Sequence, residues 1–285
     1  MSQTQDTLSI VPEIEPHEPD LYDVDGTLDG VVGLENVDEA AIARYLADGA
    51  LVVRQAYTQQ QVAAALRGVL DLIAGRSDTY RGVSYEASAR NATALPDGDA
   101  RQDFVRKLMG FVQHDQRLFA TAHDPRLLGV LERILGDRPR LMQDMALLKQ
   151  PGGREKPWHQ DHAYFPFDPS QRIVGVWIAL DEATLANGCM RVRPGEHRNG
   201  PLYHFSIRDW QICDRDMRGR KSIGVPLKPG DLLLFDSQIP HGTPMNTTNQ
   251  RRRALQFHYV GELAQRVEPE THRKWFGGDV NNVEC

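Results

Sequence analysis

The spacing of apolar residues predicts helices mainly in the first half of the chain. Between residues 38 and 135, apolar side chains recur three or four positions apart, which is typical of one buried helix face. Thr58 precedes one such stretch, and its hydroxyl suits a helix N-cap. Four stretches have this spacing: 38–46, 58–73, 104–112 and 126–135. We therefore expect four helices before Gly136.

After Gly136 the pattern changes to short apolar runs separated by turns, which is typical of strands. The dipeptide Asn187-Gly188 is a strong signal for a hairpin turn. The expected strands include one early run and three later ones: 51–53, 173–180, 232–235 and 254–260. This order predicts a mainly β protein, a sandwich or barrel, with flanking helices on one outer face.

The remaining segments indicate one domain with an arm and a tail. Residues 1–35 are acidic and poorly periodic, so we expect a flexible or surface-lying N-terminal arm. Residues 36–285 should form a single domain. Its helical part would span 36–136, its jelly-roll core about 137–262, and its C-terminal tail 263–285.

Composition excludes several classes of function. With 285 residues and a formal net charge of −6, the chain offers no electrostatic case for binding nucleic acid. No apolar run approaches the roughly 20 residues of a membrane helix, and the first residues lack the pattern of a signal peptide. Three widely spaced cysteines argue against a disulfide framework. We therefore expect a cytoplasmic monomer or homodimer that acts on a small molecule.

A candidate metal site consists of His159, Asp161 and His241. On a strand, residues two apart share a face, so His159 and Asp161 would point together and Gln160 away. Two imidazoles and one carboxylate can hold a mononuclear iron by one face and leave the other open. Taken alone, the first pair could equally be a surface ion pair, and His241 a buried core residue. The Gly-rich turn before Trp158 and an arginine downstream favour the metal site.

The downstream arginine is Arg252. Alternate residues of a strand over 252–259 share a face, and one face is apolar and should meet the helices: Leu255, Phe257 and Tyr259. The other face would line the interior, where an arginine is costly unless a carboxylate pairs with it. A bound dicarboxylate would provide that partner. The alternative is that Arg251, Arg252 and Arg253 are all solvated at a strand end. By the same alternation Trp177 faces the interior, as a cavity residue or as an ordinary core tryptophan.

Four motifs complete the pattern. Residues 158–167 read Trp-His-Gln-Asp-His-Ala-Tyr-Phe-Pro-Phe, and Asn187-Gly188 is followed by the turn Pro194-Gly195-Glu196-His197. Pro240-His241-Gly242 and Arg252 follow. Together these motifs resemble the phytanoyl-CoA dioxygenase family of iron(II)- and 2-oxoglutarate-dependent oxygenases, over about residues 140–260. The resemblance implies a double-stranded β-helix, a cupin-like jelly roll, with the N-terminal helices packed on its major sheet.

The resemblance also implies roles for individual residues. Three would hold iron(II) and form the catalytic centre: His159, Asp161 and His241. Arg252 would bind the distal carboxylate of the cosubstrate 2-oxoglutarate. Four further positions align with the cosubstrate pocket: Gln160, Trp177, Met145 and Lys107, the last on the preceding predicted helix.

The implied reaction consumes 2-oxoglutarate and O2 and releases succinate and CO2 while a C–H bond of the substrate is oxidised, most simply by hydroxylation. Related halogenases lack the carboxylate ligand, so Asp161 points to hydroxylation, desaturation or rearrangement. The alternatives are a cupin-like metal enzyme that uses no 2-oxoglutarate, or an inactive binding subunit. The sequence does not identify the substrate, because the loops 76–105 and 199–222, where this family forms the substrate entrance, match nothing securely.

Overall fold

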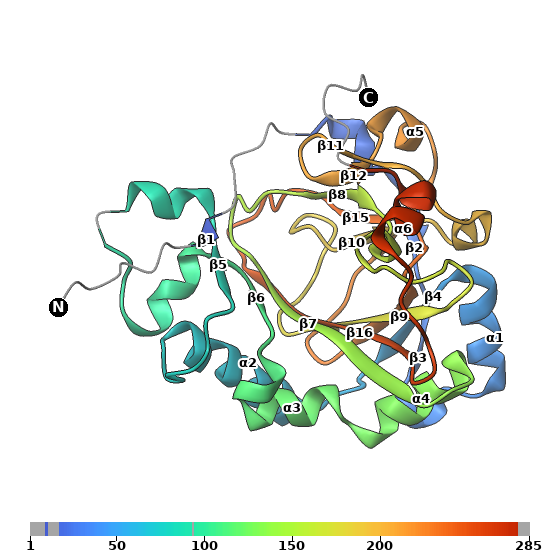
Figure 1. Ribbon diagram of the computed structural model, residues 1–285. Helices are drawn as coiled ribbons and strands as arrows, with labels where there is room; N and C mark the ends of the chain where they lie inside the picture. Colours follow the sequence, from blue (N-terminus) through green and yellow to red (C-terminus); the bar gives the residue numbers. More distant parts are fainter. Residues whose placement is uncertain (1–8, 11–16, 93, 279–285) are drawn as a thin grey trace.

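The computed structural model describes residues 9–10, 17–92 and 94–278. Two facing sheets form a jelly roll (Figure 1). Within the described residues the larger sheet has nine strands, in the spatial order β1 (Ser9–Ile10), β5 (Val83–Tyr85), β6 (Val105–Met109), β7 (Pro139–Lys149), β16 (Arg252–Gly261), β9 (Ile173–Ala179), β14 (Leu232–Asp236), β4 (Ala50–Arg54) and β3 (Gly30–Val32).

The smaller sheet has five strands in the described part of the chain, in the order β2 (Val24–Thr27), β13 (Ser222–Val225), β10 (Met190–Val192), β15 (His241–Thr243) and β8 (Lys156–His159). A separate ribbon consists of β11 (His204–Ser206) and β12 (Trp210–Ile212). The sheets are mixed and do not close into a barrel, yet the arrangement is the expected cupin-like double-stranded β-helix.

The helices are α1 (Glu39–Asp48), α2 (Gln59–Ile73), α3 (Gln116–Ala122), α4 (Pro125–Leu135), α5 (Asp214–Met217) and α6 (Pro269–Phe276). Short 3-10 turns are η1 (Pro19–Tyr22), η2 (Leu34–Asn36), η3 (Ala87–Asn91), η4 (Gly98–Phe104), η5 (Val112–His114), η6 (Asp161–Tyr164) and η7 (Glu196–Asn199). The first four helices cover the outer face of the larger sheet, as expected (Figure 1). Thr58 caps α2, and Gln61 returns the hydrogen bond in a capping box.

Strand alternation separates the two hydrophobic cores. On β16, Leu255 and Phe257 pack with the helices, while Ala254 lies in the core between the sheets. On β9, Val176 faces the helices and Trp177 faces the interior. The faces predicted for both strands are therefore confirmed, and the interior face is the one that builds a cavity.

Four sequence expectations need correction or addition. The helix expected over 104–112 is wrong: Val105–Met109 is strand β6, which pairs with β7. The polar loop over 76–100 contains β5 and two 3-10 turns. The described part of the N-terminal arm does lie at the surface, but β2 and β3 also extend the two sheets. The expected tail contains helix α6.

Among the described residues, no helix is long and apolar enough to cross a membrane.

Candidate metal and cosubstrate site

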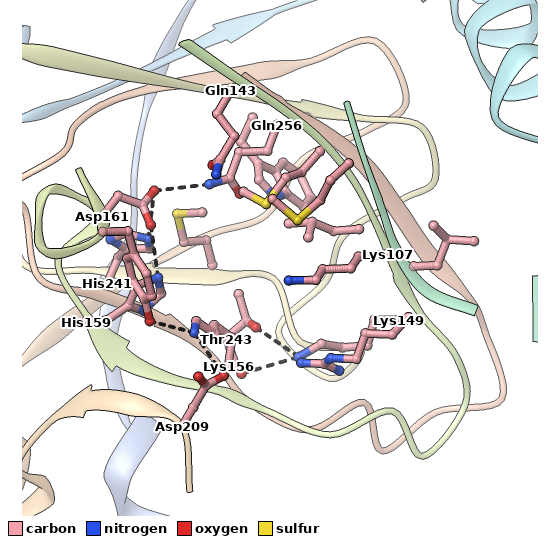
Figure 2. A pocket seen from close by; sticks show the side chains of 18 of the residues that line it. Lys107, Gln143, Lys149, Lys156, His159, Asp161, Asp209, His241, Thr243 and Gln256 are labelled. Atoms are coloured by element: carbon pink, nitrogen blue, oxygen red, sulfur yellow. Dashed lines mark hydrogen bonds and ion pairs between the residues drawn. The ribbon is translucent and has the colours of Figure 1, made fainter. Parts of the chain in front are cut away.

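The three predicted ligands converge because β8 and β15 are neighbouring antiparallel strands. His159 ends β8, His241 begins β15, and the two are directly opposed in the ladder. Asp161 begins the 3-10 turn η6 and is not on a strand, so the parity argument gave the right face for a residue just beyond the strand. One ligand atom from each residue lies within 4.8 Å of the others (Figure 2). All three side chains are buried.

Both imidazoles present the same nitrogen to this point. His159 Nδ1 lies 2.7 Å from the carbonyl oxygen of Pro157, and His241 Nδ1 lies 3.0 Å from that of Ile239. A carbonyl only accepts, so each Nδ1 carries the proton and each Nε2 offers a lone pair. Burial, and then the neighbouring His159, lowers the pKa of His241 to about 3. The imidazole is therefore neutral at physiological pH, as metal binding requires.

Asp161 is held from the other side by two residues of β16. Gln256 Nε2 donates to Asp161 Oδ2 at 3.0 Å, and His258 Nε2 lies 2.7 Å from the same oxygen. Burial alone would raise the pKa of Asp161, but attraction to His241 and His258 and hydrogen bonds from imidazoles hold it well below its usual value. Asp161 is thus an ionised, fixed carboxylate. The sequence had placed Gln256 and His258 on the interior face without giving them a role.

Arg252 lies in the same cavity and has donors to spare. Its side chain is 3% exposed, and its guanidinium carbon lies 5.2 Å from the centre of the Trp177 ring. Among the described residues, the buried Nε and Nη1 atoms have no hydrogen-bond partner. Burial lowers the pKa of Arg252 to about 10, which leaves it charged at neutral pH. A buried cation with unused donors fits a carboxylate ligand.

The neighbouring arginines differ from Arg252. Arg251 pairs with Asp103, and Arg253 pairs with Asp181 at 2.7 Å. Both therefore have protein partners near the strand end, which distinguishes them from the interior arginine. This observation agrees with the prediction that one of the three turns inward.

The cavity has a volume of about 240 Å³, and its lining includes two of the other predicted pocket residues, Met145 on β7 and Lys107 on β6. Figure 2 shows Lys107 pointing toward the side of the cavity that carries the ligand triad. Burial, and then repulsion from Lys156, lowers the pKa of Lys107. Lys107 is therefore a cation of the cavity wall, although it lies on a strand and not on the expected helix.

Gln160 lies outside the cavity lining. Its side-chain amide donates to the carbonyl oxygens of Gly200 and Gln238, and its Oε1 accepts from Leu202 N at 2.8 Å. The residue is fully buried. The structure therefore does not bring Gln160 together with the other pocket positions; Gln160 instead ties the ligand turn to the loop that begins at Gly200.

Thr243 and Lys149 line the cavity beside Arg252 and were missed by the sequence reasoning. Lys149 Nζ donates to Thr243 Oγ1 at 2.9 Å. Burial, and then repulsion from Arg252, holds the pKa of Lys149 well below its usual range. The position of Thr243 two residues after His241 on a strand was the available signal, because such residues share a face.

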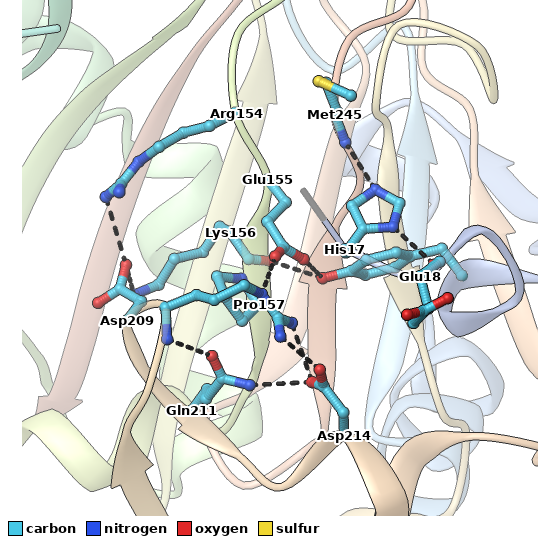
Figure 3. A network of polar contacts seen from close by, with 12 residues as sticks. His17, Glu18, Arg154, Glu155, Lys156, Pro157, Asp209, Gln211, Asp214 and Met245 are labelled. Carbon is cyan, nitrogen blue, oxygen red and sulfur yellow. Dashed lines mark hydrogen bonds and ion pairs between the residues drawn. The ribbon is translucent and has the colours of Figure 1, made fainter. Parts of the chain in front are cut away.

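A polar network binds the 199–222 loop to the strand that carries His159 (Figure 3). Glu155, only 2% exposed, accepts from Tyr22 Oη at 2.6 Å and pairs with Arg208. Arg208 also pairs with Asp214 in α5. The loop that the sequence left unread is therefore anchored by buried charge, and the N-terminal arm contributes to the anchor.

The open end of the cavity is the rim, which we define by Arg154, Lys156, Tyr164 and Asp209. Lys156 Nζ lies 2.9 Å from Asp209 Oδ2, and Arg154 Nη2 lies 3.8 Å from the same oxygen. Lys156 also donates to Tyr164 Oη at 2.9 Å. The rim residues are partly exposed, whereas the triad is buried.

The residues present fit both an iron(II) ion and 2-oxoglutarate. Two neutral imidazoles and one ionised carboxylate form the donor set of non-haem iron centres. The unpartnered guanidinium nitrogens of Arg252 fit the distal carboxylate of the cosubstrate in the same cavity. The fold and this site define the class of non-haem iron oxygenases that use 2-oxoglutarate.

Within that class, the chain belongs to the phytanoyl-CoA dioxygenase (PhyH) family, whose model matches residues 45–254. The peroxisomal phytanoyl-CoA dioxygenase of Bos taurus is 30% identical over 193 residues, which cover 63% of this chain and 55% of the relative. The chain spans about half the length of the curated relatives it matches.

Solved structures share the fold. EvdO2 from Micromonospora carbonacea var. aurantiaca, complexed with 2-oxoglutarate, matches with a TM-score of 0.66 at 24% identity, over 85% of this chain and 97% of that one. EctD from S. alaskensis, with 2-oxoglutarate and 5-hydroxyectoine, matches with a TM-score of 0.63 at 22% identity, over 93% and 90% of the two chains.

Proposed function

We propose that this protein uses iron(II), 2-oxoglutarate and O2 to oxidise a C–H bond of a small or medium-sized organic metabolite, with release of succinate and CO2. The observation that carries the proposal is the buried Arg252, with unpartnered donors, in one cavity with His159, Asp161 and His241. A metal enzyme without 2-oxoglutarate would have no use for this uncompensated cation.

In this proposal His159, Asp161 and His241 hold the iron. Arg252 binds the distal carboxylate of 2-oxoglutarate against the face of Trp177. Met145 and Lys107 complete the cosubstrate pocket, Lys107 as a further contact to carboxylate oxygen. Gln160 acts from outside the cavity by fixing the ligand turn. The bound iron and cosubstrate supply the oxidising chemistry, and the protein supplies their orientation and a cavity largely screened from water.

Hydroxylation is the most direct outcome for this site. Asp161 occupies the position that would have to be vacant for a halide ligand, and Gln256 and His258 hold it there. The same site supports desaturation or rearrangement when the substrate, rather than the metal centre, dictates the second step. The mass of the product distinguishes these outcomes: one added oxygen means hydroxylation, and the loss of two hydrogens means desaturation or ring closure.

The proposal is tested in two stages. Iron(II) and 2-oxoglutarate added without O2 should give a visible charge-transfer band, and a substrate panel should then stimulate succinate release. Asp161→Ala and His241→Ala should abolish substrate-linked succinate formation, because each removes one of three metal ligands. Arg251→Ala, which changes an arginine paired outside the cavity, serves as the control. Retained turnover in either ligand variant would contradict the metal assignment, and absence of the band would contradict the use of 2-oxoglutarate.

A further inference from the structure

The cavity carries more positive charge than its metal and cosubstrate would use. Its lining among the described residues contains six basic side chains: Arg106, Lys107, Lys149, Arg154, Lys156 and Arg252. It contains two carboxylates, Asp161 and Asp209. An iron(II) ion and a doubly charged 2-oxoglutarate would cancel one another. They would therefore leave this imbalance as it is.

Protein partners remove only part of the excess. Glu86 pairs with Arg106 at 3.3 Å, and the burial of Lys149 favours its neutral form. Of the four cations left, Asp161 and Asp209 offset two. A net positive charge thus stays in the cavity after the described partners and the cosubstrate are counted. Charge without a partner in a part-buried site is unfavourable, so a ligand that supplies it would be bound more tightly.

The available charge lies at the rim. One oxygen atom, Asp209 Oδ2, serves both Lys156 at 2.9 Å and Arg154 at 3.8 Å. Burial alone would raise the pKa of Asp209, yet Lys156 and the backbone N–H of Trp210 lower it to about 2. The rim therefore favours negative charge more strongly than one carboxylate uses.

The rim is also close enough to the triad for one small substrate to reach both. Lys156 is three residues before His159 on β8 and pairs with Thr243 in the ladder to β15. Its ammonium donates to Tyr164 Oη, and the Tyr164 ring centre lies 5.9 Å from that of His159. Figure 2 shows Lys156 and Asp209 on the His159 side of the cavity. A molecule bound at the rim would thus direct its carbon skeleton toward the ligand triad.

We propose that the substrate carries an anionic oxygen group, a carboxylate or a phosphate, which Lys156 and Arg154 bind at the rim while Asp209 acts as their exchangeable counterion. This inference rests on the proposed oxygenase function. Arg252 and Lys107 are kept for the cosubstrate, so the rim is a separate subsite. Lys156 is then the residue that selects anionic substrates, and Asp209 competes with them.

The test uses the full-length iron-loaded enzyme and sets of compounds that share a carbon skeleton. Each set contains a carboxylate, a phosphate monoester and an uncharged primary amide, scored by succinate release above the substrate-free rate. The carboxylate and phosphate arms identify which anion is used. Three variants are compared with the wild type: Lys156→Met, Asp209→Asn and the control Lys228→Met, which changes an exposed lysine outside the cavity lining.

Stimulation should be confined to anionic compounds. Lys156→Met should raise the KM of the best anion about tenfold or more, because a charge-assisted hydrogen bond is lost. Asp209→Asn should lower the same KM, because a competing carboxylate is removed, and Lys228→Met should leave it unchanged. These opposite signs at two adjacent rim residues would not arise from a general loss of structure.

The inference is overturned if an uncharged amide is the best substrate, or if Lys156→Met and Lys228→Met have the same KM. It is also overturned if Asp209→Asn raises KM as Lys156→Met does. The charge-transfer band and the substrate-free turnover of 2-oxoglutarate are recorded for each protein. Their presence with neutral substrates would contradict only the anionic subsite, whereas their absence from the wild type would contradict the oxygenase function itself.

Discussion

At the scale of single residues, Gln256 and His258 determine how Asp161 offers its carboxylate. Both direct a nitrogen at Oδ2, and both are buried, so this oxygen is already occupied by two donors. Oδ1 lies 3.1 Å from His159 Nε2, on the side where the ligand atoms meet. Donors that fix a ligating carboxylate act on metal affinity without touching the metal. These two residues are therefore positioning residues of the proposed iron site.

His258→Phe should weaken metal binding about 10–100-fold, the usual cost of losing such an outer partner. Phenylalanine keeps a ring beside Phe165 and Phe235 but removes the donor to Asp161. Calorimetric titration with Mn(II) measures this effect without turnover. His258→Gln retains a donor and should recover part of the affinity. Equal Mn(II) affinity in the wild type and both variants would show that the hydrogen bond has no positioning role.

Arg252→Ala should raise the concentration of 2-oxoglutarate needed for half-maximal turnover by about tenfold or more, since a charge-assisted contact to carboxylate is lost. The charge-transfer band, titrated with 2-oxoglutarate without O2, measures the same change as a binding constant. Arg251→Ala is the matched control, because its guanidinium pairs with Asp103. An unchanged requirement in Arg252→Ala would move the role to Lys107 or to a neighbouring arginine.

At the scale of elements, alternation and helical spacing predicted what local burial decides. The helices α1, α2 and α4 and the strands β9, β14 and β16 lie close to their expected positions because each buries one face or both faces of a regular element. The run at 104–112 was misread because Val105, Leu108 and Phe111 recur every three residues. Pairing of Lys107 with Leu147 made it a strand instead. Such pairing is a long-range property that spacing alone does not contain.

Helix α6 shows the same limit, because it lies in the segment expected to be a tail. Its last residue, Phe276, is fully buried and stacks on His162 at 5.5 Å and on His272 at 4.8 Å between ring centres. His162 is the residue after Asp161. Helix α6 therefore packs behind the turn that carries the carboxylate ligand.

Phe276→Ala should lower the free energy of unfolding by about 3 kcal/mol, at the lower end for a buried phenylalanine because the helix is terminal. It should also weaken Mn(II) binding, since the turn after Asp161 loses its support. Urea unfolding and Mn(II) titration measure the two effects. Phe119→Ala removes an aromatic ring that is 42% exposed and is the matched control. Loss of stability without any change in metal affinity would contradict coupling between α6 and the site.

At the scale of the whole molecule, the site joins segments that are distant in the sequence. Two histidines meet across the small sheet, Asp161 is fixed from β16 of the large sheet, and Glu155 ties both to the loop at Arg208. The ligand set could be predicted because spacing and a family resemblance identify it. The rim network could not, because Asp209 and Lys156 are brought together only by the loop's anchor to β8. Each of these contacts depends on a tertiary arrangement that no local pattern encodes.

The same packing predicts how stability depends on pH. Burial lowers the pKa of His162 to about 4 and that of His204 to about 3. Both are therefore neutral in the folded state, whereas in the unfolded chain they would gain protons below about pH 6.5. Their stabilising contribution is complete above about pH 6.5. It is lost as the pH falls toward the folded values, because protons then bind the unfolded chain preferentially.

At about pH 5 each of these imidazoles should cost about 2 kcal/mol of unfolding free energy relative to about pH 7.5. Urea unfolding at the two pH values measures the difference. His204→Gln keeps an acceptor for the backbone N–H of Gln160, which His204 Nε2 accepts at 2.9 Å, but cannot titrate. This variant should lose about half of the pH dependence. A free energy that is the same at both pH values in the wild type would show that these histidines are not held neutral by the fold.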